Sequence, residues 1–233
     1  MKIKALHNWD VTYGEAVQLQ EELRKQLILF DDNHTSKIKT VAGADISYAR
    51  GDDLFFVAVV LLEYPTLKVL EKVSCSQRVT FPYIPGLLTF REGPPLLTAF
   101  ERLNHVPDVV IFDGHGIAHP RRIGLASHMG LFLDVPTIGC AKKKLIGFYA
   151  DPGPRRMDHT PLTIESETIG AVVRTKEKVK PVFISQGHRI SLARAVDIAL
   201  SCCTRYRLPE PTREAHLEVN RIRQKNVLRL SPC

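Results

Sequence analysis

The stretch TVAGADISYARGDDLFFVAVVLLEYPTLKVLEKVSCSQRVTF (residues 40–81) decides the fold. It holds three segments rich in Val, Ile, Leu and Phe, namely TVAGADISYA, LFFVAVVLLEY and TLKVLEKVSCSQRVTF, which turn signals in GDD and YPT separate. Segments of this composition and length are typical of β-strands. Because the three follow one another at short spacing, they predict an antiparallel meander.

Strands and helices alternate from about residue 90 onward. EGPPLLTAFERLNH predicts a helix with its prolines in the first turn, and PDVVIFDG predicts a buried strand. ASHMGLFLD predicts a helix, PTIGCA a short strand, ADPGPRRMDHT a loop, and ETIGAVVRT and KPVFISQG two further strands. This alternation indicates an α/β fold with a layered sheet.

Three more helices are expected, one before the meander and two at the end of the chain. Thr12 and Glu15 form a potential capping box ahead of a helix over 13–30, which the polar break DDNHTSK (31–37) ends. Ser191 is a candidate cap for a helix through Cys203, and a basic terminal helix is expected over 213–229. With no internal repeat, linker or low-complexity segment, residues 1–233 are expected to form a single domain.

The composition excludes several classes of protein. Hydrophobic residues make up 44% and charged residues 24% of the 233 residues, as in soluble globular proteins. No apolar run approaches the ~20 residues of a membrane span, and MKIKALHNWD is not a secretory leader, so a cytosolic protein is expected. The net charge of +7 favours a polyanionic partner. Structural disulfides and a zinc ribbon are not expected, because the cysteines are odd in number and no pair has C-x-x-C spacing; they are Cys75, Cys140, Cys202, Cys203 and Cys233.

Three carboxylates are candidates for a metal site. Asp45 lies within a predicted strand and Asp113 directly after another, where a charge is costly to bury without a positive partner. Glu92 lies near the opening of the predicted helix. Three such oxygen ligands suit Mg²⁺ or Mn²⁺ and phosphodiester hydrolysis. The alternative is structural: strand-end caps or salt bridges for the aspartates, and the helix dipole for Glu92.

Histidines offer a second kind of metal site. His115 and His119 are four residues apart and His128 follows, so zinc is an alternative. Two histidines four residues apart bind one zinc ion when they lie on a helix. Gly116, between the two, and Pro120, directly after His119, disfavour a helix here, and no glutamate follows His115, which argues against zinc. His119 is instead interpreted as a proton donor or phosphate contact, with a structural role as the alternative.

Two basic or glycine-rich loops could contact phosphate. DGHGIAHPRRIGLASH contains three glycines and two arginines, whose backbone and side chains could approach a phosphate or a base; it could also be a tight turn. AKKK (141–144) follows a predicted strand and could place Lys142 at a phosphate, or form a solvated face. FPYIPG (81–86) is either an apolar turn on the core or a stiff, exposed wedge.

These segments together resemble the endonuclease V family. GADISY, FPYIPGLLTFREGP, DVVIFDGHGIAHPRRIGLASHMGLFLDVPTIGCAKKKL and RLPEPTREAH occur in the family's order between about residues 10 and 216. The resemblance implies a ribonuclease H-like fold, with a central mixed sheet that includes the meander and helices on both faces.

The resemblance also implies roles for individual residues. Asp45 and Asp113 match direct metal ligands, and Glu92 matches the third acidic position. Lys142 and His119 match the lysine and histidine beside the scissile phosphate and lesion loop. His216 occupies a position that varies between Asp and His in the family, so it is an active-site candidate without a committed metal contact. The lesion-binding residues would be Tyr83, Ile84, Pro85, Gly86, Leu88, Gly114, Gly116, Arg121, Gly124 and Leu125.

The implied reaction is Mg²⁺-dependent hydrolysis of the second phosphodiester 3′ to a deoxyinosine, with Mn²⁺ as a substitute metal. The products would have 3′-hydroxyl and 5′-phosphate ends, and the lesion would stay in place for other repair proteins. Tyr83 would stack or insert where hypoxanthine leaves the helix. The alternatives are a ribonuclease for inosine in RNA and a lesion-binding protein without catalysis. A monomer is the simplest expectation.

Overall fold

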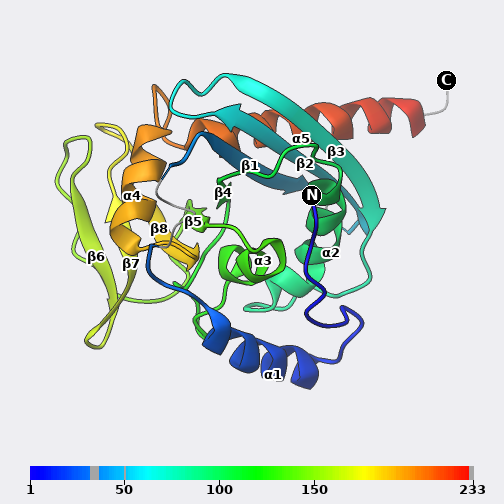
Figure 1. The fold of residues 1–233 in the computed structure, drawn as a ribbon, viewed down its shortest axis with the longest axis horizontal. Helices are drawn as coiled ribbons and strands as arrows, with labels where there is room; N and C mark the ends of the chain where they lie inside the picture. The colour runs from blue at the N-terminus through cyan, green and yellow to red at the C-terminus, as the bar shows by residue number, and fades with distance from the viewer. Residues whose placement is uncertain (32–36, 50, 231–233) are drawn as a thin grey trace.

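The protein, represented by a computed structural model that describes residues 1–31, 37–49 and 51–230, is built on one eight-stranded mixed sheet (Figure 1). The strand order is β3-β2-β1-β4-β5-β8-β7-β6. The predicted meander is confirmed as β1 (Thr40–Ser47), β2 (Leu54–Glu63) and β3 (Val69–Arg78), which pair antiparallel. Most of the predicted break at 31–37 and Cys233 lie outside the described residues.

Three parallel strands form the centre of the sheet. β1 pairs parallel with β4 (Val109–Phe112), and β4 pairs parallel with β5 (Thr137–Ala141). Beyond them β8 (Val182–His188), β7 (Glu167–Val173) and β6 (His159–Ile164) pair antiparallel. β6 was not predicted, because its polar start belongs to a proline- and arginine-rich segment that was interpreted as a loop. The carboxyl ends of the parallel strands meet at one edge, where loops can form a site.

Helices cover both faces of the sheet. α2 (Leu88–Glu101) and α3 (Leu125–Leu133) share one apolar core with β1, β2 and β4. α4 (Leu192–Ser201) and the first part of α5 (Glu210–Leu230) share a second core with the opposite face. Figure 1 shows α1 (Tyr13–Leu23) farther out, beyond α3. The ribonuclease H-like class expected from the sequence is confirmed.

Two predicted helices have different limits. The helix expected over 13–30 ends at Leu23, and a 3₁₀ turn (Arg24–Gln26) follows. The chain then becomes extended, because Ile28 is held to β8 by hydrogen bonds from its amide to His188 Nδ1 and from the Arg189 amide to its carbonyl. Tertiary contacts thus override the local apolar period. The predicted capping box of α1 is confirmed.

The position of the prolines in α2 was predicted wrongly. The helix begins at Leu88, so Pro94 and Pro95 lie in its interior. Interior prolines cost helix hydrogen bonds, but the buried rings of Phe90 and Phe100 hold α2 in the core. Glu92 is therefore in the second turn of the helix and not at its opening.

The two C-terminal helices were predicted with their limits shifted by a few residues. Ser191 caps α4 through its hydroxyl as predicted, while α4 ends at Ser201 before Cys203. α5 begins at Glu210, three residues before the predicted start. A Cβ on Gly43 of β1 would lie 2.1 Å from the Pro211 carbonyl, so α5 packs directly on the strand that carries Asp45.

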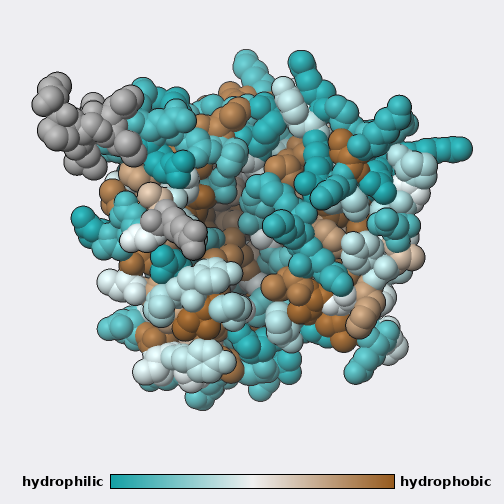
Figure 2. All heavy atoms as spheres, turned by 180° about the vertical axis from the view of Figure 1, so that it is seen from behind, coloured by the Kyte–Doolittle hydropathy of each residue, from teal (hydrophilic) through white to brown (hydrophobic). Residues whose placement is uncertain are grey.

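The surface agrees with the composition. Figure 2 shows hydrophilic side chains around a central hollow that has hydrophobic side chains inside it. Over the described part of the chain, no helix combines the length and apolar character that crossing a bilayer requires. The four cysteines that the structure describes are free and buried.

Candidate active site

Asp45 and Asp113 lie side by side at the carboxyl ends of neighbouring strands. Ala44 of β1 is paired with Phe112 of β4, so the next residue of each strand is an aspartate at the same edge. The prediction that the two carboxylates lie on neighbouring strands is confirmed. Glu92, from α2, is near enough to both aspartates that their charges raise its pKa.

The three carboxylates repel one another in a poorly hydrated environment. Burial, followed by the charges of Asp45 and Asp113, raises the pKa of Glu92 to about 8. Burial also raises the pKa of Asp45, and Asp113 adds to the effect, whereas a hydrogen bond from His216 opposes it. A cluster of this kind favours a cation or protons.

Each aspartate is contacted by one basic side chain. His216 Nδ1 lies 2.7 Å from Asp45 Oδ2, and the Asn220 amide donates to His216 Nε2 at 3.1 Å. Lys142, which follows β5, forms an ion pair with Asp113. The structure thus places His216 and Lys142 at the carboxylate cluster. Asn220 was missed, although its spacing of four residues from His216 places both on one face of a helix.

The donor set fits a divalent ion by its chemistry. Three carboxylates are the hard oxygen donors that Mg²⁺ and Mn²⁺ take, and a cation would relieve the repulsion that raises the pKa of Asp45 and Glu92. Within residues 1–31, 37–49 and 51–230, no three His, Cys, Asp or Glu side chains already have the arrangement of a metal centre. Asp45 and Asp113 are directed toward His216 and Lys142 instead.

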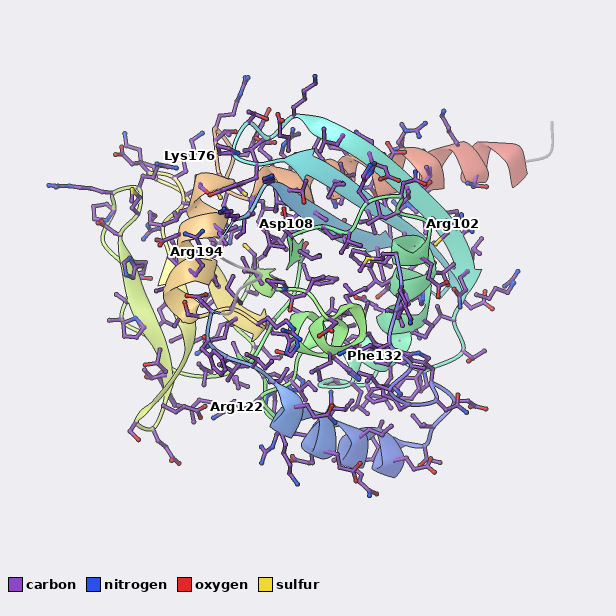
Figure 3. The ribbon with its side chains drawn as sticks, viewed as in Figure 1. Arg102, Asp108, Arg122, Phe132, Lys176 and Arg194 are labelled. Atoms are coloured by element: carbon purple, nitrogen blue, oxygen red, sulfur yellow. The ribbon has the colours of Figure 1, made fainter. Side chains whose placement is uncertain are left out.

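Not every aspartate at a strand end belongs to the cluster. Asp108, labelled in Figure 3, precedes β4 at the opposite end of the sheet. Its Oδ2 accepts hydrogen bonds from the Lys39 and Thr40 amides at 2.8 and 2.9 Å. Asp108 therefore ties the amino ends of β1 and β4 together, which is the structural role that was the alternative for Asp45 and Asp113.

A small pocket lies beside the carboxylate cluster. It has a volume of about 150 Å³ and opens between the FPYIPG segment and the loop after β4. Gly114, which follows Asp113, and Leu145, three residues after Lys142, both line it. Its walls are Tyr83, Ile84, Pro85, Gly86, Leu88, Thr89, Gly114, His115, His119, Gly124, Leu125 and Leu145.

Most of the predicted lesion-binding residues line this pocket, with two exceptions. Gly116 packs against β8, where an added Cβ would lie 2.1 Å from the Gln186 carbonyl oxygen, and its amide donates to Ser185. Arg121 lies behind the wall and donates to the Gly86 carbonyl. Thr89, His115 and Leu145 line the pocket but were not among the predicted lesion-binding residues. No pattern marks Thr89 and Leu145, and His115 was considered only as a potential zinc ligand.

The FPYIPG segment is anchored at both ends and exposed between them. Phe81 packs in a cluster with Phe90, while Tyr83 is 64% exposed. At the other end the Gly86 carbonyl accepts hydrogen bonds from Arg121 at 2.8 Å, His119 at 3.0 Å and Gln20 at 3.1 Å. A backbone fixed at its ends with an exposed ring between them agrees with a stiff wedge.

His119 helps to hold the Gly86 end of the FPYIPG segment in place. Its Nε2 contacts the Gly86 carbonyl, and its Nδ1 accepts from the Arg121 amide at 3.2 Å. Because both ring nitrogens are used within the protein, the structural alternative for His119 is favoured over a proton donor. His115 contacts the Lys143 carbonyl and His128 contacts His7, so each of the three histidines considered for zinc has a different hydrogen-bond partner.

Because His119 is buried, the free energy of unfolding is expected to fall as the pH is lowered. Burial, with a smaller effect of Arg121, lowers the pKa of His119 to about 4, whereas the unfolded chain titrates near 6.5. The unfolded state therefore takes up the proton first. As the pH falls from ~6.5 to ~4, protonation of His119 in the unfolded state should lower the free energy of unfolding by about 3 kcal/mol, at about 1.4 kcal/mol per pH unit. Urea unfolding at several pH values measures this slope.

The His119→Gln variant is the control for this acid effect, since glutamine can still donate to Gly86 but does not titrate. Its stability should fall less steeply with acid, by about 1.4 kcal/mol per pH unit. An unchanged slope in this variant would show that the acid loss comes from other groups, such as the buried His128, whose pKa burial also lowers.

A mixed sheet of this topology, with carboxylates at the carboxyl ends of its adjacent central strands, is that of a ribonuclease H-like nuclease. The family model for endonuclease V matches residues 21–217. The chain belongs to the endonuclease V family, and the resemblance inferred from the sequence is confirmed.

Individual members of the endonuclease V family are similar to this chain in sequence and in structure. The chain is 50% identical over 205 residues to an endonuclease V of Dictyoglomus thermophilum, covering 88% of each chain. It is 46% identical to one of Gloeobacter violaceus, covering 94% of this chain and 90% of the other. The crystal structure of endonuclease V from Bacillus subtilis superposes with a TM-score of 0.91 at 33% identity, covering 97% and 100% of the chains.

A structure of Ciona intestinalis endonuclease V bound to a 23mer DNA also matches. That DNA contains an inosine followed by a ribo-adenosine. The TM-score is 0.82 at 31% identity, with coverage of 92% of this chain and 99% of the other.

Proposed function

We propose that this protein is a DNA repair endonuclease that recognises deoxyinosine and hydrolyses the second phosphodiester 3′ to it, leaving 3′-hydroxyl and 5′-phosphate ends. The observation that carries the proposal is the adjacency of the carboxylate cluster and the 150 Å³ pocket. Asp113 is followed by the pocket residue Gly114, and Lys142 precedes Leu145 in the same loop. A base held in the pocket would therefore have its own backbone near the carboxylates.

Asp45, Asp113 and Glu92 would hold Mg²⁺, with Mn²⁺ as a substitute. When bound there, the ion would neutralise phosphate charge and lower the pKa of an attacking water. His216 keeps the Asp45 carboxylate oriented through the 2.7 Å contact. Lys142 supplies a positive charge beside Asp113, where it can reach a phosphate oxygen.

Recognition would rest on shape and on the weak pairing of the lesion. Deaminated bases pair less firmly, so turning one out of the stack costs less than for a normal base. Gly114 and Gly124 both line the pocket, and Gly124 packs so closely on the loop that an added Cβ would lie 2.5 Å from the His115 carbonyl oxygen. Backbone amides there could donate to the C6 oxygen of hypoxanthine, where adenine has an amine that donates instead. A wall of backbone would also leave little room for the 2-amino group of guanine.

The remaining expectations from the sequence fit the same proposal. We also propose that the protein acts as a monomer. One sheet runs through all eight strands, which agrees with one nuclease domain over residues 1–233. We infer a cytoplasmic enzyme that nicks DNA and leaves the lesion to other repair proteins.

An inosine-specific ribonuclease is the second candidate. The Ciona intestinalis relative was solved with a DNA in which a ribo-adenosine follows the inosine, so a ribonucleotide next to the lesion is compatible with this architecture. A lesion-binding protein without catalysis is less well supported, because Asp45, Asp113, Glu92 and Lys142 are all present and lie together.

The test uses matched duplexes that contain either one deoxyinosine or one adenine at the same position, with Mg²⁺ or with EDTA. A nick directly 3′ of the lesion's 3′ neighbour, at the second phosphodiester, is expected only with deoxyinosine and Mg²⁺. A parallel RNA with one inosine measures the ribonuclease alternative: faster RNA cleavage would replace the DNA proposal. Binding that persists in EDTA, with no nick at any metal concentration, would show a binding module.

A further inference from the structure

A second hollow is also lined by the 142–149 loop, which contributes Leu145 to the pocket. It has a volume of about 590 Å³ and lies between this loop and the connection from β7 to β8. Asp151 is the one carboxylate in its lining. We call it the basic groove, because six of its lining residues are cationic: Lys142, Lys143, Lys144, Arg174, Lys178 and Lys180.

Two arginines support the walls of the basic groove through hydrogen bonds to backbone carbonyls. The Arg174 guanidinium donates to the carbonyls of Pro152, Gly153 and Val179, and so ties both walls together. Arg207 donates to the carbonyls of Lys142 at 2.9 Å and Pro181 at 2.8 Å. Figure 3 labels Lys176 on the β7–β8 connection, and its ammonium is also fixed, on the Arg205 carbonyl. The groove is therefore held open by hydrogen bonds before any ligand binds.

Its other lysines carry unneutralised charge. Lys143, Lys144, Lys178 and Lys180 are exposed, and none forms an ion pair with a carboxylate in the described part of the chain. Lys178 has a φ of 59°, a conformation that few residues other than glycine adopt. Four free ammonium groups around one hollow repel each other and favour a polyanion.

Two aromatic rings stand beside these lysines. Phe148 is 75% exposed, yet its backbone is fixed by two hydrogen bonds to Thr163 at 2.8 and 2.9 Å. Tyr149 lines the groove and packs edge-on against Phe183. Lys144 Nζ lies 5.7 Å from the centroid of each ring. Fixed, exposed rings among cations are typical of surfaces that bind single-stranded nucleic acid, where bases stack on the rings.

The basic groove is continuous with the candidate active site. Lys142 lines the groove and pairs with Asp113, while Leu145 of the same loop lines the lesion pocket. Lys142 thus belongs both to the carboxylate cluster and to the groove lining. Resting on the proposed cut 3′ to the lesion, we propose that the basic groove binds the DNA strand that continues 3′ of the scissile phosphate, in single-stranded form, with a base stacked on Phe148.

The lysine variant Lys178→Gly/Lys180→Gln tests the charge. Glycine keeps the backbone conformation of residue 178 and removes its side chain. For a single-stranded deoxyinosine oligonucleotide with a long 3′ extension, measured by fluorescence anisotropy in EDTA, affinity at 0.1 M salt should fall about tenfold or more. The log–log salt slope should become shallower by about 1.4. Lys2→Gln/Lys68→Gln is the matched control, since both exposed lysines lie outside the groove lining and the control should bind as the parent does.

Three comparisons make the result decisive. An oligonucleotide that ends just after the scissile phosphate should bind the parent and the lysine variant equally; an equal loss on both substrates would overturn the placement. Phe148→Leu should weaken binding of the extended strand severalfold without changing the salt slope. Unchanged binding in this variant would show that no base stacks on Phe148. A lesion-free strand reports on the groove alone: the lysine variant should weaken its binding even if the protein fails to nick deoxyinosine, so the two proposals fail separately.

Discussion

Asp113→Asn should lower the nicking rate on a deoxyinosine duplex by about a thousandfold or more. The substitution removes one of the three charges that would hold a divalent ion, and such an ion contributes several kcal/mol to transition-state stabilisation, with about 1.4 kcal/mol for each factor of ten. Asparagine has the same shape, and the Asp113 side chain is only 21% exposed, so packing is preserved. Single-turnover cleavage in Mg²⁺ measures the loss, and thermal unfolding verifies the fold.

Two further variants separate the metal role from other causes. Asp113→Asn also deprives Lys142 of its partner, whereas Asp45→Asn leaves that ion pair intact and should lose activity to a similar extent. Asp197→Asn makes the same chemical change on the exposed face of α4 and should cleave at the parental rate. Parental activity in both Asp45→Asn and Asp113→Asn would disprove the carboxylate site.

Tyr83→Ala should reduce the preference for deoxyinosine over adenine by roughly tenfold to a hundredfold. A base stacked on an aromatic ring gains about 1–3 kcal/mol, and Tyr83 is the exposed ring at the pocket mouth. Because the ring is 64% exposed, its removal should change the unfolding temperature little. The measurement is the ratio of binding constants for two duplexes that differ only in that base.

Tyr13→Ala is the matched control for Tyr83→Ala. Tyr13 is 60% exposed at the start of α1 and does not line the pocket. The control should discriminate as the parent does. If Tyr83→Ala also keeps the parental ratio, the FPYIPG segment is a turn on the core and the wedge interpretation is wrong.

The sequence predicts the centre of this site better than its surroundings. Asp45 and Asp113 each lie within or directly after an apolar strand segment, and charge in such places is costly enough to identify both. Their adjacency follows once β1 and β4 pair in parallel. Gly116 could not be separated from Gly114 in this way, because its contact with the Gln186 carbonyl depends on β8, 70 residues later in the chain.

Local patterns also fail where distant segments decide the conformation. The apolar period of residues 13–30 continues past Leu23, but contacts of Ile28 with β8 favour an extended chain. Pro94 and Pro95 resemble a helix start, yet the helix begins six residues earlier because Phe90 is buried. In both cases long-range packing outweighs a local preference of a few kcal/mol.

The triple hydrogen bond to the Gly86 carbonyl has a consequence for how the protein would search DNA. Donors from α1 and from the loop after β4 converge on this one oxygen, so the FPYIPG segment has little freedom to fold around a paired base. Such a segment would contribute little movement of its own to pulling a base out of the stack. It must meet a base that has already opened by thermal fluctuation. The frequency of spontaneous opening in the duplex, and not a motion of the enzyme, would then set the rate at which lesions are captured.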